Sequence, residues 1–427
     1  MYGILPFMKT MRNILILSFA LLLGLLSSCT STQLSSDIDM SDPRREDLQV
    51  LMTTLENNHP DLYSVHKEKD FKALYEEILV SAPQMEDIEF YFAVRELVAQ
   101  VGDSHTMVGF PKDIAASLHA LPIQIAYVNN AWRLIVVEKS QEPMLGSEVL
   151  SLNGVSIEQI MERAEPLVGY DNQVWFNQNV SQLLNIAEFY TYVGITENAS
   201  DPITLTIDHR TCQNVSSSSI TPISITEFYQ KEFVTLYDNP SRTGSARVYY
   251  RTEFLDTQED ILFIQYNVCA SDPAFPIEGF IEETLALVSS KKPSKIIVDL
   301  RYNGGGDSSL AEPLIDGLAR YQRAQGFTLD VLIGERTFSS ALMNAVQLKQ
   351  RSNATLVGTP TGGSVNHFGE VRSFTLPNSG IPVQHSTKFF VMDKSHQGGS
   401  LQPDVFVTPT VEDLLSGVDT VVQTRIE

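Results

Sequence analysis

Residues 295 to 306 read Lys-Ile-Ile-Val-Asp-Leu-Arg-Tyr-Asn-Gly-Gly-Gly, and this stretch decides which fold the chain can adopt. A short, nearly continuous apolar run that ends in glycines is typical of a strand buried on both faces of a sheet. Successive glycines allow close backbone approach and can point N–H groups at a negative charge, although a flexible turn at the strand end is the alternative. A phosphate-binding loop is excluded, because the Gly-Lys-Ser/Thr ending is missing.

Strands and helices alternate around this segment. Strands are expected at 261–266, 295–300 and 329–333, and helices at 277–288, 310–319 and 340–350. This alternation predicts an α/β core in which helices cover both faces of a parallel or mixed sheet. Catalytic residues of such sheets usually lie at the carboxyl ends of the strands.

Two further units precede the core. From 45 to 110 the apolar residues recur at helical spacing, with breaks at Pro60 and Pro83, so we expect a unit of three helices. From 111 to 208 short strands, one helix and the turn signal Asn153-Gly154 predict a small β module. A serine-rich connector at 216–219 follows, and the core is assigned to 209–427.

The N-terminus has the pattern of an export signal. Lys9 and Arg12 precede an apolar run, at 14–26, that is too short to span a membrane, so residues 1–29 are expected to be a signal peptide. Cys29 at its end resembles the lipobox of bacterial lipoproteins, which implies a lipid-anchored protein of the cell envelope, on the periplasmic side or the cell surface. A plain cleaved signal is the alternative. Residues 30–44 have the composition of a flexible tether.

The net charge and the cysteines limit which ligands and metal sites can be expected. A formal net charge of -22 argues against nucleic acid, because nucleic-acid binding rewards excess Lys and Arg. Cys212 and Cys269 either pair in an oxidising compartment or remain buried thiols. Neither has a histidine at metal-ligand spacing, so the sequence predicts no metal site, and we expect no cofactor.

Two polar segments contain candidate catalytic groups. The strand at 331–333 runs through a turn into Ser339, Ser340 and a helix, where unpaired N–H groups can stabilise an oxyanion. A helix cap is the alternative role of these serines. His105 follows the helical unit within Gly-Asp-Ser-His-Thr, and a histidine can act as a base near neutral pH. Sequence spacing does not show that His105 and Ser339 meet.

Together these segments resemble the tail-specific (C-terminal-processing) protease family. The resemblance rests on Asp-Ser-His-Thr at 103–106, Asp-Leu-Arg-Tyr-Asn-Gly-Gly-Gly at 299–306, Thr-Phe-Ser-Ser at 337–340, Gly-Thr-Pro-Thr-Gly-Gly at 358–363 and Pro-Asp at 403–404. It implies a crotonase-like αβ peptidase core with a mixed sheet. Separately, Leu-Gly-Ser-Glu-Val-Leu-Ser-Leu-Asn-Gly at 145–154 in the β module resembles the strand pair of a permuted PDZ domain, which captures an extended peptide at a sheet edge, with an ordinary β-hairpin as the alternative.

The family has two branches. One uses a Ser-Lys dyad, but Ser364 stands at the lysine position and no lysine occurs between 349 and 388. The chain therefore resembles the other branch, which includes the tricorn protease core and interphotoreceptor retinoid-binding protein. By this resemblance Ser339 is the nucleophile, His105 is the general base and Ser104 is a supporting hydroxyl.

The resemblance also implies an oxyanion hole and an orienting acid. The oxyanion would accept hydrogen bonds from the backbone N–H groups of Ser340, Gly304 and Gly305. Where the branch has a glutamate, this chain has Gln397, which can orient an imidazole but cannot stabilise its positive charge. Glu370 is the alternative acid.

The sequence thus predicts a serine peptidase that hydrolyses exported proteins or peptides through an acyl-enzyme, with a polypeptide as its partner. A competing hypothesis is a peptidase-fold lipoprotein that binds peptides or hydrophobic ligands without turnover. Gln397 favours binding alone, whereas the retained Ser339 and His105 favour catalysis. Substrate specificity and oligomeric state are left open.

Overall fold

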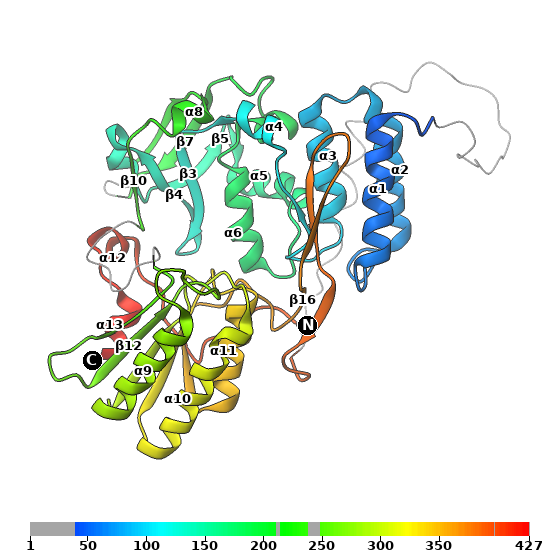
Figure 1. Cartoon of the computed structure of the whole chain (residues 1–427). Coiled ribbons are helices and arrows are strands. Elements are labelled where there is room, and N and C mark those ends of the chain that lie inside the picture. The colour runs from blue at the N-terminus through cyan, green and yellow to red at the C-terminus, as the bar shows by residue number, and fades with distance from the viewer. Residues whose placement is uncertain (1–38, 211–213, 238–247, 397, 427) are drawn as a thin grey trace, which may run out of the picture. The chain divides into compact units, whose positions relative to one another are not determined.

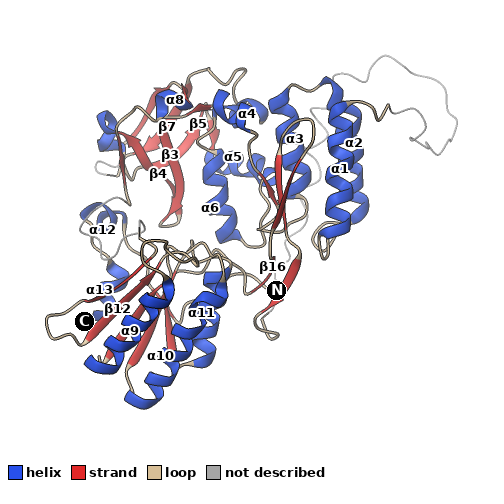
Figure 2. Cartoon of the chain, in the orientation of Figure 1, coloured by secondary structure: helices blue, strands red, loops and turns tan. Residues whose placement is uncertain are grey.

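The computed structural model describes residues 39–210, 214–237, 248–396 and 398–426 (Figure 1). It confirms the predicted multi-domain α/β architecture with a mixed sheet (Figure 2). No helix of the described residues is long and apolar enough to cross a membrane. The predicted signal peptide with Cys29, and also Cys212 and Gln397, lie outside the described residues.

Three helices form the N-terminal part, as the sequence predicts. They are α1 (Pro43–Asn58), α2 (Glu68–Ser81) and α3 (Asp87–Ala99), and the short α4 (Lys112–Ser117) follows. Helix α1 begins inside the expected tether, because the Asp42 side chain accepts the N–H groups of Arg44 and Arg45. Helix α3 leads directly into the loop that contains His105.

The β module is an antiparallel sheet with the strand order β10-β4-β5-β7-β8, to which β3 and β6 are added on β4 and β5. Its strands are β3 (Ile123–Val128), β4 (Ala131–Glu138), β5 (Glu148–Leu152), β6 (Val155–Ser156), β7 (Ile203–Asp208), β8 (Val215–Ile220) and β10 (Phe233–Thr235). Its helices are α5 (Ile157–Ala164), α6 (Gln173–Leu183) and α7 (Ala187–Tyr192). Asn153 and Gly154 both have positive φ, which confirms the predicted turn.

The β module ends later than the sequence suggests. The serine-rich stretch predicted as a connector is the edge strand β8, which pairs with β7 from Ile203↔Ile220 to Asp208↔Val215. Serine on both faces gives this strand no apolar alternation, so its pairing depends on β7 rather than on its own pattern.

The core is a six-stranded sheet in the order β11-β12-β13-β14-β15-β20, with only the β11–β12 pair antiparallel. The strands are β11 (Tyr250–Phe254), β12 (Ile261–Tyr266), β13 (Lys295–Asp299), β14 (Thr328–Ile333), β15 (Ala354–Gly358) and β20 (Val405–Phe406). The helices are α9 (Ile277–Lys291), α10 (Glu312–Gln325), α11 (Ser340–Arg351), α12 (Val411–Ser416) and α13 (Thr420–Ile426).

Both faces of the core sheet are covered, as predicted. On one face Ile264, Val298 and Val331 pack in one apolar cluster with residues of α9, α10 and α11. On the other face Phe263, Ile297, Leu332 and Val357 pack with Val421 and Val422 of α13. Strands β13 and β14 run in parallel register, with Val298 opposite Val331, so the loops after them lie at the same edge.

In the described part of the chain, three short sheets accompany the two large ones, and one of them joins segments that are far apart in the sequence. Strand β1 (Met107–Val108) directly follows His105 and pairs with β18 (Pro382–His385), which pairs with β17 (Arg372–Thr375). Strand β16 (Asn366–Gly369) pairs with β19 (Lys388–Val391), and β2 (His119–Ala120) pairs with β9 (Ile223–Ser224). The chain just after His105 is therefore held by a strand from the C-terminal part of the sequence.

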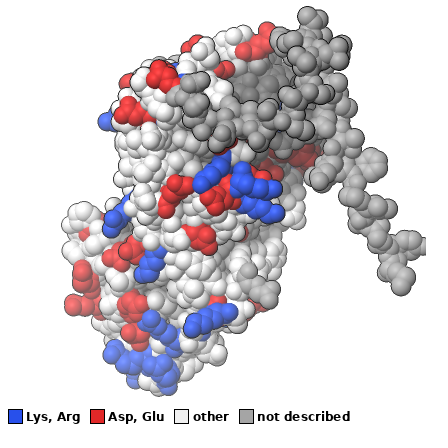
Figure 3. Space-filling model, turned by 90° about the vertical axis from the view of Figure 1, so that its right-hand side faces the viewer, with Lys and Arg blue, Asp and Glu red and all other residues white. Residues whose placement is uncertain are grey.

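Acidic and basic side chains are interspersed on the face drawn in Figure 3, and most of that face is uncharged. This distribution accompanies the formal net charge of -22. A surface of this kind lacks the single-sign basic stripe that phosphate backbones attract.

Candidate active site

Ser339 occupies the turn between β14 and α11. Its φ of 51° and ψ of -124° place a non-glycine residue at positive φ, and its side chain makes no capping hydrogen bond. The turn is held by Thr337, whose hydroxyl donates to the Leu300 carbonyl (2.9 Å) and accepts the Gly334 N–H (3.0 Å). Such a strained strand-to-helix turn is the arrangement that presents a nucleophilic serine, and the cap alternative is not supported for Ser339.

The glycine loop packs directly against this turn. A Cβ on Gly305, whose φ is +109°, would lie 2.8 Å from Ser339 Cβ, so only glycine fits there. The Gly305 N–H donates to Asn303 Oδ1 (2.9 Å), so in this structure it is not available to an oxyanion. Oxyanion donors at Gly304 and Ser340 stay a prediction. Asn303 was not among the residues predicted for the site; it is fully buried, and its side-chain amide donates to the Tyr266 carbonyl (3.0 Å).

His105 lies against the residue that precedes Ser339. Its ring stacks on Phe338 with 4.5 Å between the ring centroids, and Trp175 stacks on Phe338 at 3.5 Å. His367 of β16 adds a third ring near His105, at 5.5 Å. Neither ring nitrogen of His105 has a hydrogen-bond partner among the described residues, so no hydrogen bond joins it to Ser339 here. Catalytic hydrogen bonds often form only once substrate is bound.

Burial sets the protonation state of His105. The residue is 6% exposed, and burial lowers its pKa to about 4, although Asp103 acts in the opposite direction. Burial also lowers the pKa of His367. The His105 imidazole is therefore neutral at pH 7, which is the form that accepts a proton.

Ser104 points into a buried polar network. Its hydroxyl donates to Asp171 Oδ1 (2.6 Å) and accepts the Asp171 N–H (3.1 Å), just before α6 begins. Burial raises the pKa of Asp171. Asn172 joins the network by donating to the hydroxyl of Ser364, at 2.9 Å. Ser104 thus fixes the His105 loop to the β module. Ser364, which stands where the Ser-Lys branch would have its lysine, contributes a neutral, buried hydroxyl.

Glu370 does not orient His105. Its side chain is 63% exposed and pairs with Lys388 at 3.6 Å, whereas the His105 side chain is 8% exposed. The carboxylate that lies beside His105 is Asp103, with 3.9 Å between Oδ1 and the ring Nδ1. Asp103 was not among the residues predicted for the site, although it stands two residues before the histidine in the sequence.

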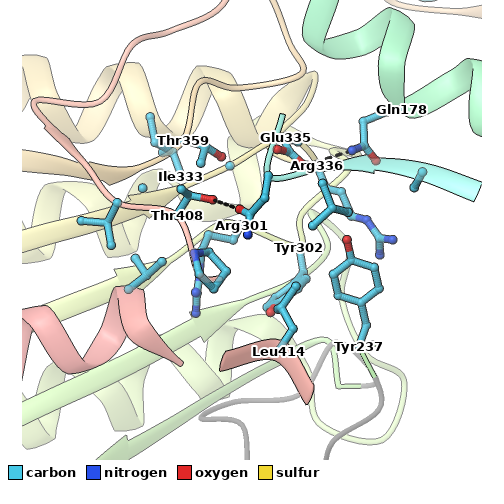
Figure 4. A pocket seen from close by; sticks show the side chains of 18 of the residues that line it. Gln178, Tyr237, Arg301, Tyr302, Ile333, Glu335, Arg336, Thr359, Thr408 and Leu414 are labelled. Carbon is cyan, nitrogen blue, oxygen red and sulfur yellow. Dashed lines mark hydrogen bonds between the residues drawn. The ribbon is translucent and has the colours of Figure 1, made fainter. Parts of the chain in front are cut away.

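A cavity of about 590 Å³ borders the glycine loop. Strand β3 and helix α6 form one side, Tyr302 and Gly304 lie on the core side, and its lining is mainly apolar. A smaller adjoining pocket contains Glu335 and Arg336, which precede Ser339 (Figure 4). There Gln178 donates to Glu335 (3.1 Å), burial raises the pKa of Glu335, and the Arg336 guanidinium lies over the Tyr237 ring.

No group of three or more His, Cys, Asp or Glu side chains in the described part of the chain is arranged to hold a metal ion. Cys269 is a buried free thiol whose Sγ donates to Asn303 Oδ1 at 3.5 Å, and burial raises its pKa to about 11. Of the two alternatives that the sequence leaves open for Cys269, a disulfide or a buried thiol, this structure shows the buried thiol, and Cys212 itself is not among the described residues.

No family model matches the sequence, and neither does any curated protein. Solved structures do match. Mature CPAF complexed with lactacystin is 14% identical, with a TM-score of 0.61, over 90% of this chain and 97% of that one. This chain shares its fold with CPAF. A serine-to-alanine variant of CPAF is 13% identical, with a TM-score of 0.62, over 90% and 96% of the two chains.

Proposed function

We propose that this protein is a serine peptidase of the tail-specific type, with Ser339 as nucleophile and His105 as general base. The observation that carries the proposal is the strained turn of Ser339, whose side chain makes no capping hydrogen bond and follows Phe338, on which the neutral ring of His105 stacks. The fold shared with CPAF, whose solved structures include a lactacystin complex and a serine-to-alanine variant, supports it.

The proposed reaction follows from these groups. His105 takes the proton of the Ser339 hydroxyl as the serine oxygen attacks the substrate carbonyl carbon. The negative charge that develops on the carbonyl oxygen lies near the N-terminus of α11, where the Ser340 N–H and the Gly304 N–H would stabilise it. His105 then gives its proton to the leaving amine, and a water hydrolyses the acyl-enzyme by the same steps in reverse.

The substrate would enter through the 590 Å³ cavity. Strand β3 pairs only with β4 among the described strands, and residues of β3 line the cavity. An extended peptide that adds to this strand edge would run past Gly304 toward Ser339, which is the PDZ-like capture that the sequence suggests.

Labelling with a fluorophosphonate probe tests the assignment. We expect the wild-type protein from Ser41 onward to be labelled, and Ser339→Ala and His105→Ala to lose labelling, because the first lacks the nucleophile and the second its base. Ser290→Ala, on an exposed turn of α9, and His209→Ala are matched controls that should label as wild type. Labelling that survives in Ser339→Ala would refute the assignment.

A binding protein without turnover is the second candidate. The absence of a hydrogen bond between His105 and Ser339 in this structure favours it. Folded wild-type protein that takes no label but retains a peptide in the cavity would establish this function instead.

We also propose that the protein is exported and anchored by a lipid on Cys29. Membrane-fraction protein that incorporates radiolabelled fatty acid is the expected result, and Cys29→Ser should abolish both the label and the membrane association. Fatty-acid incorporation that persists in Cys29→Ser would contradict the anchor.

A further inference from the structure

His105 needs a partner that stabilises its protonated form during the reaction, and the exposed Glu370 does not supply one. Asp103 does lie beside the ring, because its Oδ1 accepts the backbone N–H of His105 at 2.8 Å. That bond fixes the carboxylate 3.9 Å from His105 Nδ1. The position of the charge relative to the ring is thus set by the backbone of the loop itself.

The surroundings of Asp103 favour its ionised, carboxylate form. It is 1% exposed, and its Oδ2 accepts hydrogen bonds from the hydroxyls of Thr106 (2.6 Å) and Ser386 (2.5 Å) and from His59 (3.2 Å). Burial alone would raise the pKa of Asp103, but the bond from His59, the nearby His105 and the two hydroxyls hold that pKa below its usual value. The buried group therefore keeps its negative charge at neutral pH.

His59 is oriented to hold this carboxylate. Its Nδ1 accepts the Asp61 N–H at 3.3 Å, which leaves the proton on Nε2, the atom that faces Asp103. The His59 side chain is 0% exposed, and its ring packs against Phe368 with 4.9 Å between the ring centroids. The end of α1, the His105 loop and Ser386, which directly follows β18, thus converge on one carboxylate.

We propose that Asp103, held by His59, is a positioning residue that stabilises the imidazolium of His105. This inference rests on the proposed function. The proton moves from the Ser339 hydroxyl to His105 and later to the leaving amine, and Asp103 stays ionised throughout. An opposite charge within about 4–6 Å of an imidazole favours its protonated form, which is what a general base needs in the transition state.

Among the described residues, the other titratable groups near His105 do not supply this charge. His367 faces it from β16 and donates its Nδ1 proton to the Ser364 carbonyl, at 2.9 Å. Asp171, before α6, is bound to the Ser104 hydroxyl. Among the described residues, Asp103 is the carboxylate that lies within ion-pair distance of the His105 ring, at 3.9 Å from Nδ1.

The pKa of His105, measured by NMR titration of its ring, distinguishes support by charge from a merely structural role. If Asp103 acts by charge, Asp103→Asn lowers this pKa by about one or more below the wild-type value. If Asp103 only maintains the fold, its loss admits water to the ring and the pKa rises toward that of an exposed histidine. A rise, or no change, in folded Asp103→Asn overturns the proposal.

Labelling rates with the fluorophosphonate probe give a second readout. We expect Asp103→Asn to label about 10²-fold more slowly, within the range that a general base contributes. His59→Ala should also slow labelling, and His59→Gln should recover it, because the glutamine amide can donate to Asp103. Glu370→Gln is the matched control and should label as wild type.

If Asp103→Asn does not fold, His59→Ala and His59→Gln test the same role of Asp103. Folded His59→Ala that labels at the wild-type rate would overturn it. Wild-type protein that takes no label would instead refute the proposed function, and the NMR titration would still decide whether Asp103 supports His105.

Discussion

Replacing Arg301 with alanine is expected to lower the free energy of unfolding by about 3–5 kcal/mol, because it removes the positive charge that compensates two buried carboxylates. The Arg301 guanidinium donates to Asp299 at the end of β13 (2.7 and 2.9 Å) and to Asp419 before α13 (2.7 and 2.8 Å). The side chains of Asp299 and Asp419 are 0% and 2% exposed, so water cannot replace the lost donors. The pair of carboxylates also holds the pKa of Arg301 above its usual value.

Urea denaturation at pH 7, followed by circular dichroism, measures this effect. The matched control is Lys349→Ala, which removes a surface ion pair with Asp404 whose two side chains are each 41% exposed. Pairs of this kind contribute at most about 1 kcal/mol. Equal unfolding midpoints for Arg301→Ala and Lys349→Ala would contradict the role of Arg301 as the link between the core sheet and the C-terminal helix.

Gly305→Ala should reduce fluorophosphonate labelling by about 10²-fold or more, because a displacement of about 1 Å at a reacting group has an effect of this size. The added Cβ would lie 2.8 Å from Ser339 Cβ, 3.1 Å from the Ser340 nitrogen and 3.2 Å from the Phe338 carbonyl oxygen. The turn that presents the serine must therefore move.

Gly279→Ala in α9 is the control for Gly305→Ala, since its Cβ would make one ordinary contact, 3.5 Å from Phe275. It should label as wild type and be slightly more stable, because alanine favours a helix over glycine. Wild-type labelling by Gly305→Ala would show that the glycine loop does not constrain the serine.

The strands and helices that could be predicted from the sequence are those whose structure is determined by nearby residues. The apolar run at 295–300 and its glycines specify a buried strand and a close approach, and parallel strands bring the segment before Ser339 to the same edge. The three N-terminal helices follow from their apolar spacing in the same way.

The missed features depend on distant partners. His59 and Asp103 are 44 residues apart, and Ser386 lies 283 residues beyond Asp103, so no local pattern shows that they share a hydrogen-bond network. Strand β8 carries serine on both faces and is specified by β7. Strand β1 is two residues long and exists only because β18 lies beside it.

The positive φ of Ser339 affects which substitutions evolution would favour at this position. Its positive φ suits glycine, and serine holds it at roughly 1–3 kcal/mol of strain. A change to glycine would therefore be favoured by folding alone while it removes the hydroxyl. Related chains that no longer need the reaction would gain stability by replacing Ser339 with glycine and would lose activity. The residue at 339 therefore distinguishes relatives that have kept the reaction from relatives that have lost it.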